Sequence, residues 1–161
     1  MAEAIFLPDT NDRKTIYDEI GPQIEALVGG ESDVTANLAN IAAVLKQAFG
    51  FFWVGFYIVK DGQLVLGPFQ GPLACTRINF DQGVCGHAYT TRETVIVPNV
   101  DEFPGHIACS SAARSEIVIP IFDRNGGVFG VLDVDSDRLA DFAQVDADGL
   151  GQIAKLVGKI I

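Results

Sequence analysis

The sequence predicts an α+β domain in which helices pack against an antiparallel sheet. Two helix patterns come first, two hairpin signals lie in the middle of the chain, and a third long helix pattern closes it. No linker, internal repeat or low-complexity tract divides the 161 residues, a length that fits one domain with a full core. We therefore expect a leader over residues 1–12 and a single domain over residues 13–161.

Two helices are expected before the sheet. Residues 15–28 carry apolar side chains at helical spacing, although Gly21 and Pro22 should break or restart this helix. Residues 34–49 carry a second apolar stripe, which Gly50 ends.

The middle of the chain predicts the first strands. Residues 51–60 are dense in aromatic and β-branched side chains, which indicates a central strand that is covered on both faces. An Asp-Gly turn at 61–62 leads into a second strand over 63–66. A loop is expected over 67–72, and a short strand candidate follows at 74–80.

A short helix over 83–93 should lead to a strand over 94–98. The passage 99–115 then lacks any regular pattern, and a loop of that length in a compact domain is usually functional or disordered. Cys109 lies in this passage. A helix over 141–161 closes the chain.

Residues 115–136 form the most informative stretch, because two β-branched runs flank a turn signal. Asn125 and Gly126 tolerate the positive φ angles of a tight hairpin turn. With these two residues as the loop, the pairing register places Glu116 opposite Asp135.

The alternation of side chains separates this hairpin into two faces. One face is apolar and is expected to join the core; it holds Ile117, Ile119, Ile121, Leu132 and Val134. Glu116, Asp133 and Asp135 fall on the opposite face, where directly opposed like charges destabilise a sheet. Open solvent, a bound cation, or a proton held at a raised pKa could compensate them, and the sequence leaves these three alternatives open.

Composition excludes some functions. A formal net charge of −10 argues against a nucleic-acid partner. The N-terminus lacks the basic start and apolar stretch of a signal peptide, and no apolar run reaches membrane-spanning length. With three cysteines and no export signal, we expect a cytoplasmic protein whose thiols are catalytic, metal-binding or buried as small hydrophobes.

The cysteines allow three kinds of chemistry. Zinc would suit Cys75, Cys85, His87, His106 and Cys109, but the spacing is poor and no Cys-x-x-Cys pair occurs. A Cys-His hydrolase could use either histidine as a base, but no orienting third group stands out. Thiol redox chemistry fits better, because a second thiol could capture an oxidised loop cysteine as a disulfide.

Five motifs together resemble one known family. They are Gly71–Ile78, Gly83–His87, Phe103–Cys109, Ser115–Pro120 and Gly130–Ser136. The combination closely resembles the free methionine-(R)-sulfoxide reductases, which are stand-alone GAF-domain enzymes. Generic GAF domains share the Gly-Val-Leu hairpin pattern but lack the three cysteines.

The resemblance implies a role for each cysteine. Cys109 matches the family's nucleophile, Cys75 matches the cysteine that resolves it, and Cys85 has a secondary catalytic role. Ser110 departs from the family pattern, which often has Asp after the nucleophile.

The resemblance also implies the substrate site. The family's binding carboxylates match Glu116, Asp133 and Asp135, of which Glu116 and Asp135 are also expected to take part in catalysis. Its pocket aromatics match Trp53 and Tyr57, which lie four apart on one strand face and could otherwise belong to the core.

The implied activity is thiol-dependent reduction of free methionine (R)-sulfoxide to methionine, through a cysteine sulfenic acid and an intramolecular disulfide. Thioredoxin would regenerate the thiols, no cofactor or metal is needed, and the enzyme would serve in oxidative stress. Pairing of GAF domains through helices suggests a homodimer. The alternative is a non-catalytic GAF module that senses a small molecule.

Overall fold

The computed structural model describes residues 4–161, so the first three residues of the predicted leader lie outside the described residues. The helices are α1 (Arg13–Gly29), α2 (Val34–Phe49), α3 (Gly83–Thr91) and α4 (Gln144–Ile160), with a 3₁₀ turn η1 (Val100–Glu102). The strands are β1 (Trp53–Lys60), β2 (Gln63–Gln70), β3 (Arg77–Ile78), β4 (Val95–Val97), β5 (Ser115–Phe122) and β6 (Val128–Ser136). They form one antiparallel sheet in the order β3-β2-β1-β6-β5-β4, which confirms the predicted α+β class.

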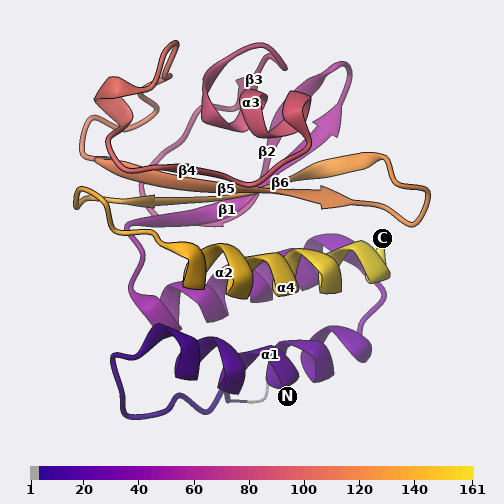
Figure 1. Ribbon diagram of the computed structural model, residues 1–161. Helices are drawn as coiled ribbons and strands as arrows, with labels where there is room; N and C mark the ends of the chain where they lie inside the picture. Colours follow the sequence, from indigo (N-terminus) through magenta and orange to yellow (C-terminus); the bar gives the residue numbers. More distant parts are fainter. Residues whose placement is uncertain (1–3) are drawn as a thin grey trace.

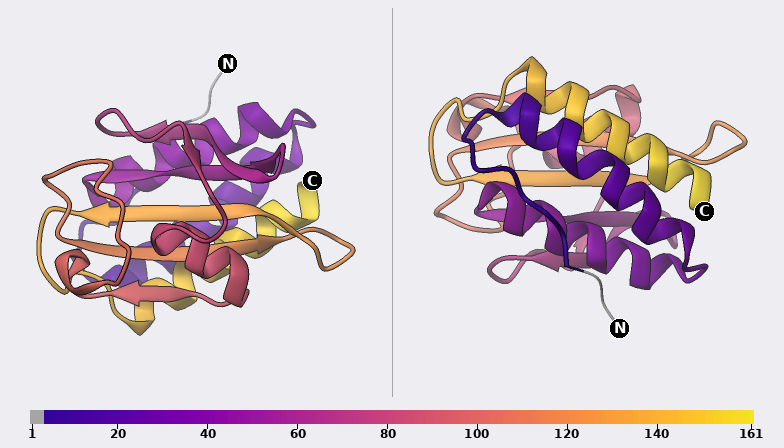
Figure 2. Two further views of the ribbon diagram at one scale, coloured as in Figure 1. Left: turned by 90° about the horizontal axis from the view of Figure 1, so that it is seen from above. Right: turned by 90° about the horizontal axis from the view of Figure 1, so that it is seen from below.

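The elements stack in layers, as Figure 1 shows. Helices α2 and α4 cover one face of the sheet, and α1 lies across their outer side (Figure 2). Helix α3 and the long loops cover the opposite face. Each face of the sheet therefore contacts its own hydrophobic cluster, the larger on the side of α2 and α4. None of the helices in residues 4–161 combines the length and hydropathy that a membrane span requires.

Helix α1 runs without a break through Pro22, so the predicted interruption is wrong. Proline removes the hydrogen bond to the carbonyl of Asp18, but both residues lie on the exposed face, where water can replace it. Ile20 and Ile24 on the opposite face are fully buried and hold the helix to the core.

Strand β2 is longer than predicted, because residues 67–70 continue it in place of the expected loop. The pairing with β1 shifts between Gly55 and Tyr57. Such a bulge admits Pro68, which has no N–H to donate to a ladder. Strand β3 is correspondingly shorter than the predicted segment 74–80.

The β5–β6 hairpin has the predicted register, with Glu116 paired to Asp135. The predicted two-residue loop is wrong. A register shift after Ile121 lengthens the loop to residues 124–126, and Gly126 takes the left-handed conformation, with φ of 80°. The five apolar residues predicted to face the core all lie in the larger hydrophobic cluster.

Residues 4–12 precede α1 without regular structure, but they contact it through hydrogen bonds. The backbone N–H of Phe6 donates to Gln23 Oε1, and Gln23 Nε2 donates to the Phe6 carbonyl, both at 2.8 Å. Asp12 caps the helix by accepting from the backbone N–H of Thr15 at 3.0 Å.

Asp146 of α4 is the buried charge that joins α1 to the rest of the fold. Its Oδ1 accepts from the Tyr17 hydroxyl at 2.8 Å, and its Oδ2 accepts from Arg13 Nη1 at 2.9 Å. Burial, together with this carboxylate, raises the pKa of Tyr17, so the phenol keeps its proton and remains a donor.

We expect Asp146→Ala to lower the free energy of unfolding by about 2–4 kcal/mol, because it leaves the buried Tyr17 hydroxyl and the Arg13 guanidinium without their shared acceptor. Urea unfolding measures the loss. Asp148→Ala, at an exposed position of the same helix, is the matched control and should change stability by less than about 0.5 kcal/mol. Equal losses in the two variants would contradict the anchoring role of Asp146.

Candidate active site

A pocket lies on the face of the sheet covered by α3 and the loops. It collects residues from β1, α3, the irregular segment after η1, and the β5–β6 hairpin. The predicted site residues that line it are Trp53, Tyr57, Cys85, Cys109, Glu116, Asp133 and Asp135. The remaining one, Cys75, is covalently bonded to Cys109. The structure therefore brings every predicted site residue to one place.

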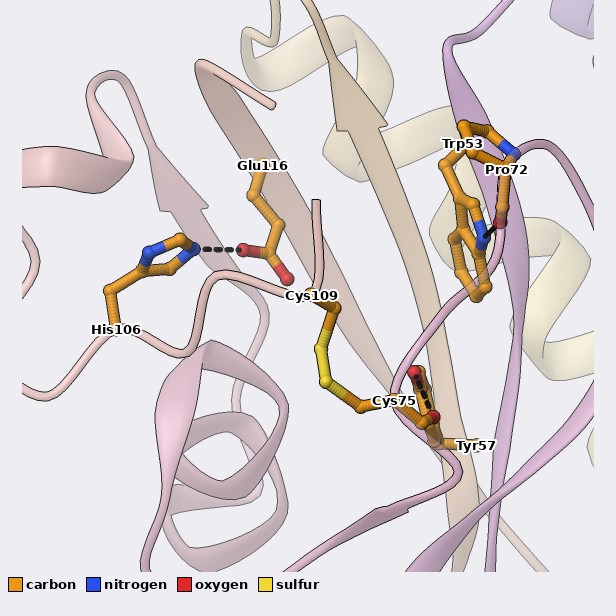
Figure 3. The surroundings of a disulfide bond; sticks show 7 residues. All are labelled: Trp53, Tyr57, Pro72, Cys75, His106, Cys109 and Glu116. Carbon is orange, nitrogen blue, oxygen red and sulfur yellow. Dashed lines mark hydrogen bonds and ion pairs between the residues drawn. A yellow bond between two sulfur atoms is a disulfide. The ribbon is translucent and has the colours of Figure 1, made fainter. Parts of the chain in front are cut away.

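Cys75 and Cys109 form a disulfide beside the pocket, as Figure 3 shows. Cys75 lies in the loop between β2 and β3, and Cys109 lies in the irregular segment before β5. Their Cα atoms are 5.3 Å apart although 34 positions separate them in the sequence. The fold thus brings two distant loops together at the pocket.

Two of the three acids on this face of the hairpin are buried and Asp135 is half-buried, which excludes open solvent as the compensation for their charges. Glu116 is 6% exposed and Asp133 is 5% exposed. Burial first, and then the charges of Asp133 and Asp135, raise the pKa of Glu116 well above its ordinary value. Burial likewise raises the pKa values of Asp133 and Asp135. These carboxyl groups cannot all ionise together, so the cluster retains protons at a pH where isolated carboxyl groups have lost them.

Cys85, on the helix α3 that packs against β5 and β6, completes this cluster. Its thiol is buried, and its pKa is raised well above the ordinary value by burial and by the nearby carboxylates, first that of Asp133. A thiol that keeps its proton is a poor nucleophile and can donate a hydrogen bond to Asp133. Asp133 Oδ1 has no hydrogen-bond partner within residues 4–161, so it is available to a donor that enters the pocket.

The structure changes the set of residues that could hold a metal. The sequence offered Cys75 and Cys109 as zinc ligands, but a disulfide occupies both. Among the described residues, one ligand atom each from Cys85, Glu116 and Asp133 lie within 4.8 Å of one another. Zinc accepts thiolate and carboxylate ligands, but here each ligand would first have to lose its proton.

His106 lines the pocket, although sequence reasoning did not assign it to the substrate site. Its Nε2 lies 3.8 Å from Glu116 Oε2, which is longer than a hydrogen bond. Burial lowers the pKa of His106, so the imidazole is neutral at neutral pH and leaves the acidic cluster without a permanent cation. His87 is exposed and does not line the pocket, which removes it as a base for a hydrolase.

Trp53 and Tyr57 line the pocket from strand β1, and both contact the loop that carries Cys75. Trp53 Nε1 donates to the carbonyl of Pro72 at 3.1 Å, and the Tyr57 hydroxyl donates to the carbonyl of Cys75 at 2.8 Å. Their rings stack with centroids 6.0 Å apart. The sequence predicted the shared face but held no signal for these backbone contacts.

Comparisons with known proteins match this architecture and site. Residues 31–161 match the model of the GAF domain. A free methionine-R-sulfoxide reductase of Escherichia coli is 39% identical, over 93% of this chain and 91% of the relative. Its Saccharomyces cerevisiae counterpart is 38% identical, over 92% of this chain and 87% of the relative. The crystal structure of the Neisseria meningitidis enzyme in complex with its substrate has 54% identity and a TM-score of 0.95, and the match covers 99% of this chain and 95% of that one.

This chain belongs to the free methionine-R-sulfoxide reductase family.

Ser110 is the departure from the family pattern that the sequence displays. It lines the pocket next to Cys109, and its Oγ accepts from the backbone N–H of Ala112 at 3.3 Å. The hydroxyl therefore stabilises the local turn of this reductase-family chain, a role that an Asp side chain at the same position could also fill.

We expect Glu116→Gln to stabilise the fold at neutral pH. The native pKa of Glu116 is raised above its ordinary value of 4.5, so the native state binds more protons than the unfolded chain between that value and the native pKa. Stability therefore falls as the pH rises through this window, a loss that the neutral Gln avoids. The gain in unfolding free energy should be on the order of 1 kcal/mol or more above the window and should vanish below it.

Urea unfolding across the pH range measures this difference. Glu102→Gln removes an acid at an exposed position of η1, and its stability relative to the parent should vary little with pH. A Glu116→Gln advantage that is the same on both sides of the window would show that the native pKa is not raised.

Proposed function

We propose that this chain reduces free methionine (R)-sulfoxide to methionine by thiol chemistry at the pocket. The observation that carries the proposal is the Cys75–Cys109 disulfide beside a cluster of buried, protonated carboxyl groups. A disulfide is the state in which one such turnover would leave the protein, and a buried carboxyl group can supply the proton that sulfoxide reduction consumes.

The first step would use Cys109 and Glu116. The Cys109 thiolate attacks the sulfoxide sulfur, and the Glu116 carboxyl group donates its proton to the sulfoxide oxygen. This attack forms an S–S bond between Cys109 and the substrate. That bond and the S–O bond then break as the protonated oxygen is transferred to Cys109, which leaves a sulfenic acid on Cys109 and releases methionine. The thiolate sulfur is oxidised by two electrons and the substrate sulfur is reduced by two. Asp135, which also holds a raised pKa beside this group, is proposed to share the proton with Glu116.

The second step would use Cys75. Its thiol condenses with the sulfenic acid of Cys109, forms the disulfide and releases water. A dithiol reductant such as thioredoxin would then reduce the disulfide by exchange and return both thiols. A cytoplasmic location, where such reductants operate, belongs to the same proposal, as does pairing into a homodimer.

Selectivity for the free amino acid would come from its ammonium group. Asp133 Oδ1 is buried without a fixed partner, and no permanent cation of the described residues lines the pocket. A substrate ammonium can supply both the charge and the hydrogen bond. The peptide nitrogen of a methionine sulfoxide within a protein carries no charge and cannot replace it.

Two cysteine substitutions separate the proposed steps. Cys109→Ser should abolish even the first turnover, because a hydroxyl is far less nucleophilic than a thiolate at neutral pH. Cys75→Ser should keep one turnover of methionine per protein but lose steady-state turnover with thioredoxin. Rapid-quench measurement of methionine tests both. A burst in Cys109→Ser would exclude it as nucleophile, and an unreactive parent protein would favour the sensor alternative.

N-acetylation of the substrate tests recognition of the ammonium. We expect kcat/KM for N-acetyl methionine (R)-sulfoxide to fall at least about tenfold, because a charge-assisted hydrogen bond to a buried group is worth on the order of 1.5–3 kcal/mol. Asp133→Asn and Asp135→Asn should reduce this preference. Asp137→Asn, at the exposed position two residues beyond Asp135, is the control and should preserve it. Equal efficiency on both substrates in the parent would reject ammonium recognition.

A further inference from the structure

Two side chains of the central strand β1 hold the loop that carries Cys75. Tyr57 donates to the carbonyl of Cys75 itself, and Trp53 donates to the carbonyl of Pro72 (Figure 3). We infer that Tyr57 and Trp53 are positioning residues for Cys75, which keep its thiol within reach of Cys109 whenever the disulfide is open. The resolving role of Cys75 rests on the proposed function, whereas the tethering of its loop does not.

The loop has little else to hold it. Residues 71–73 are exposed, and Leu73 is 89% exposed. Within residues 4–161, residues 71–75 make no other hydrogen bond; the next along the chain joins the carbonyl of Thr76 to the N–H of Leu66, at 3.0 Å. When the disulfide is reduced, the two side-chain hydrogen bonds are therefore the main polar attachments that restrain this loop.

The two donors are themselves rigid. Trp53 and Tyr57 are 3% and 1% exposed, and they lie in the middle of the sheet between β2 and β6. The Trp53 ring stacks on Tyr57 and also on Phe69, with centroids 5.3 Å apart in the second pair. Burial and the neighbouring carboxylates raise the pKa of Tyr57, so its hydroxyl remains a donor at neutral pH. An anchor of this kind fixes the loop relative to the acidic cluster.

Positioning of this kind affects the effective concentration of one thiol near the other. A free loop spreads the Cys75 thiol over many positions, most of them out of reach of Cys109. One net hydrogen bond corresponds to a change of roughly two- to twelvefold in an equilibrium constant. Both hydrogen bonds are present in the disulfide-bonded protein, whereas an open loop also samples positions in which they are broken. Removal of either tether should therefore weaken disulfide formation by up to that factor.

The test is a thiol–disulfide equilibrium of the whole protein with reduced and oxidised glutathione, without any sulfoxide. Oxidised glutathione takes two electrons from the Cys75 and Cys109 thiols, which gives the protein disulfide and two reduced glutathiones. Tyr57→Phe should lower the equilibrium constant for disulfide formation by roughly two- to twelvefold. Trp53→Phe should lower this equilibrium constant as well, because it removes the hydrogen bond from Trp53 Nε1 to the carbonyl of Pro72 in the same loop.

Tyr89→Phe is the matched control. Tyr89 is a half-buried tyrosine of α3, stacked on Phe80, and its hydroxyl makes no side-chain hydrogen bond within residues 4–161. The Tyr89→Phe variant should have the same equilibrium constant for disulfide formation as the parent protein. A Tyr57→Phe value that matches the Tyr89→Phe value would overturn the inference.

A kinetic measurement distinguishes a lost tether from a changed pocket. Hydrogen peroxide oxidises the Cys109 thiolate to the sulfenic acid with release of hydroxide, which bypasses substrate binding. The later loss of sulfenic acid to the disulfide should be slower in Tyr57→Phe than in Tyr89→Phe, and equal rates would overturn the inference. If the equilibrium shifts as expected while the parent produces no methionine, the proposed function fails alone. If the parent produces methionine and neither tether variant shifts the equilibrium, the inference fails alone.

Discussion

The constraint to which the rest of the structure responds is a group of three carboxyl groups on one covered face of a hairpin, two of them buried and Asp135 half-buried. The antiparallel register places Glu116 beside Asp135, with Asp133 on the same face. A slip of one residue would turn these carboxyl groups toward the apolar cluster under α2 and α4. The apolar residues on one face of the hairpin and the acids on the other therefore require the same register. Coverage by α3 and the loops then removes water, and burial becomes the main cause of the raised pKa values.

The two faces of the sheet are covered by different kinds of structure. On the side of α2 and α4, a continuous apolar cluster holds the strands in place. On the other side, the polypeptide runs mostly through loops, which carry Cys75 and Cys109. The proposed redox chemistry would require two sulfur atoms to meet and separate. Loops permit such a movement while the carboxyl groups remain on strands.

The sequence predicted those features that depend on local periodicity. The α2 stripe with its glycine stop, the central position of β1 and the acidic face of the hairpin all follow from spacing and turn chemistry, and the structure confirms them. The errors arose where contacts between distant residues decide the outcome. Buried Ile20 and Ile24 carry α1 through Pro22, and the bulge opposite β1 keeps Pro68 in a strand. The pairing of Cys75 with Cys109 came from family resemblance, because spacing alone cannot show which loops meet.

The disulfide also makes the stability of the molecule depend on its redox state. It joins the β2–β3 loop to the segment before β5, and it closes a covalent ring across a separation of 34 positions. In the chain-entropy model, a cross-link over a loop of this length restricts the conformational freedom of the unfolded chain. The lost entropy stabilises the folded state by about 4 kcal/mol. Opening the bond returns that freedom, so the reduced form unfolds more readily than the oxidised form. The resistance of this fold to unfolding is therefore itself a property that oxidation and reduction of one bond can change.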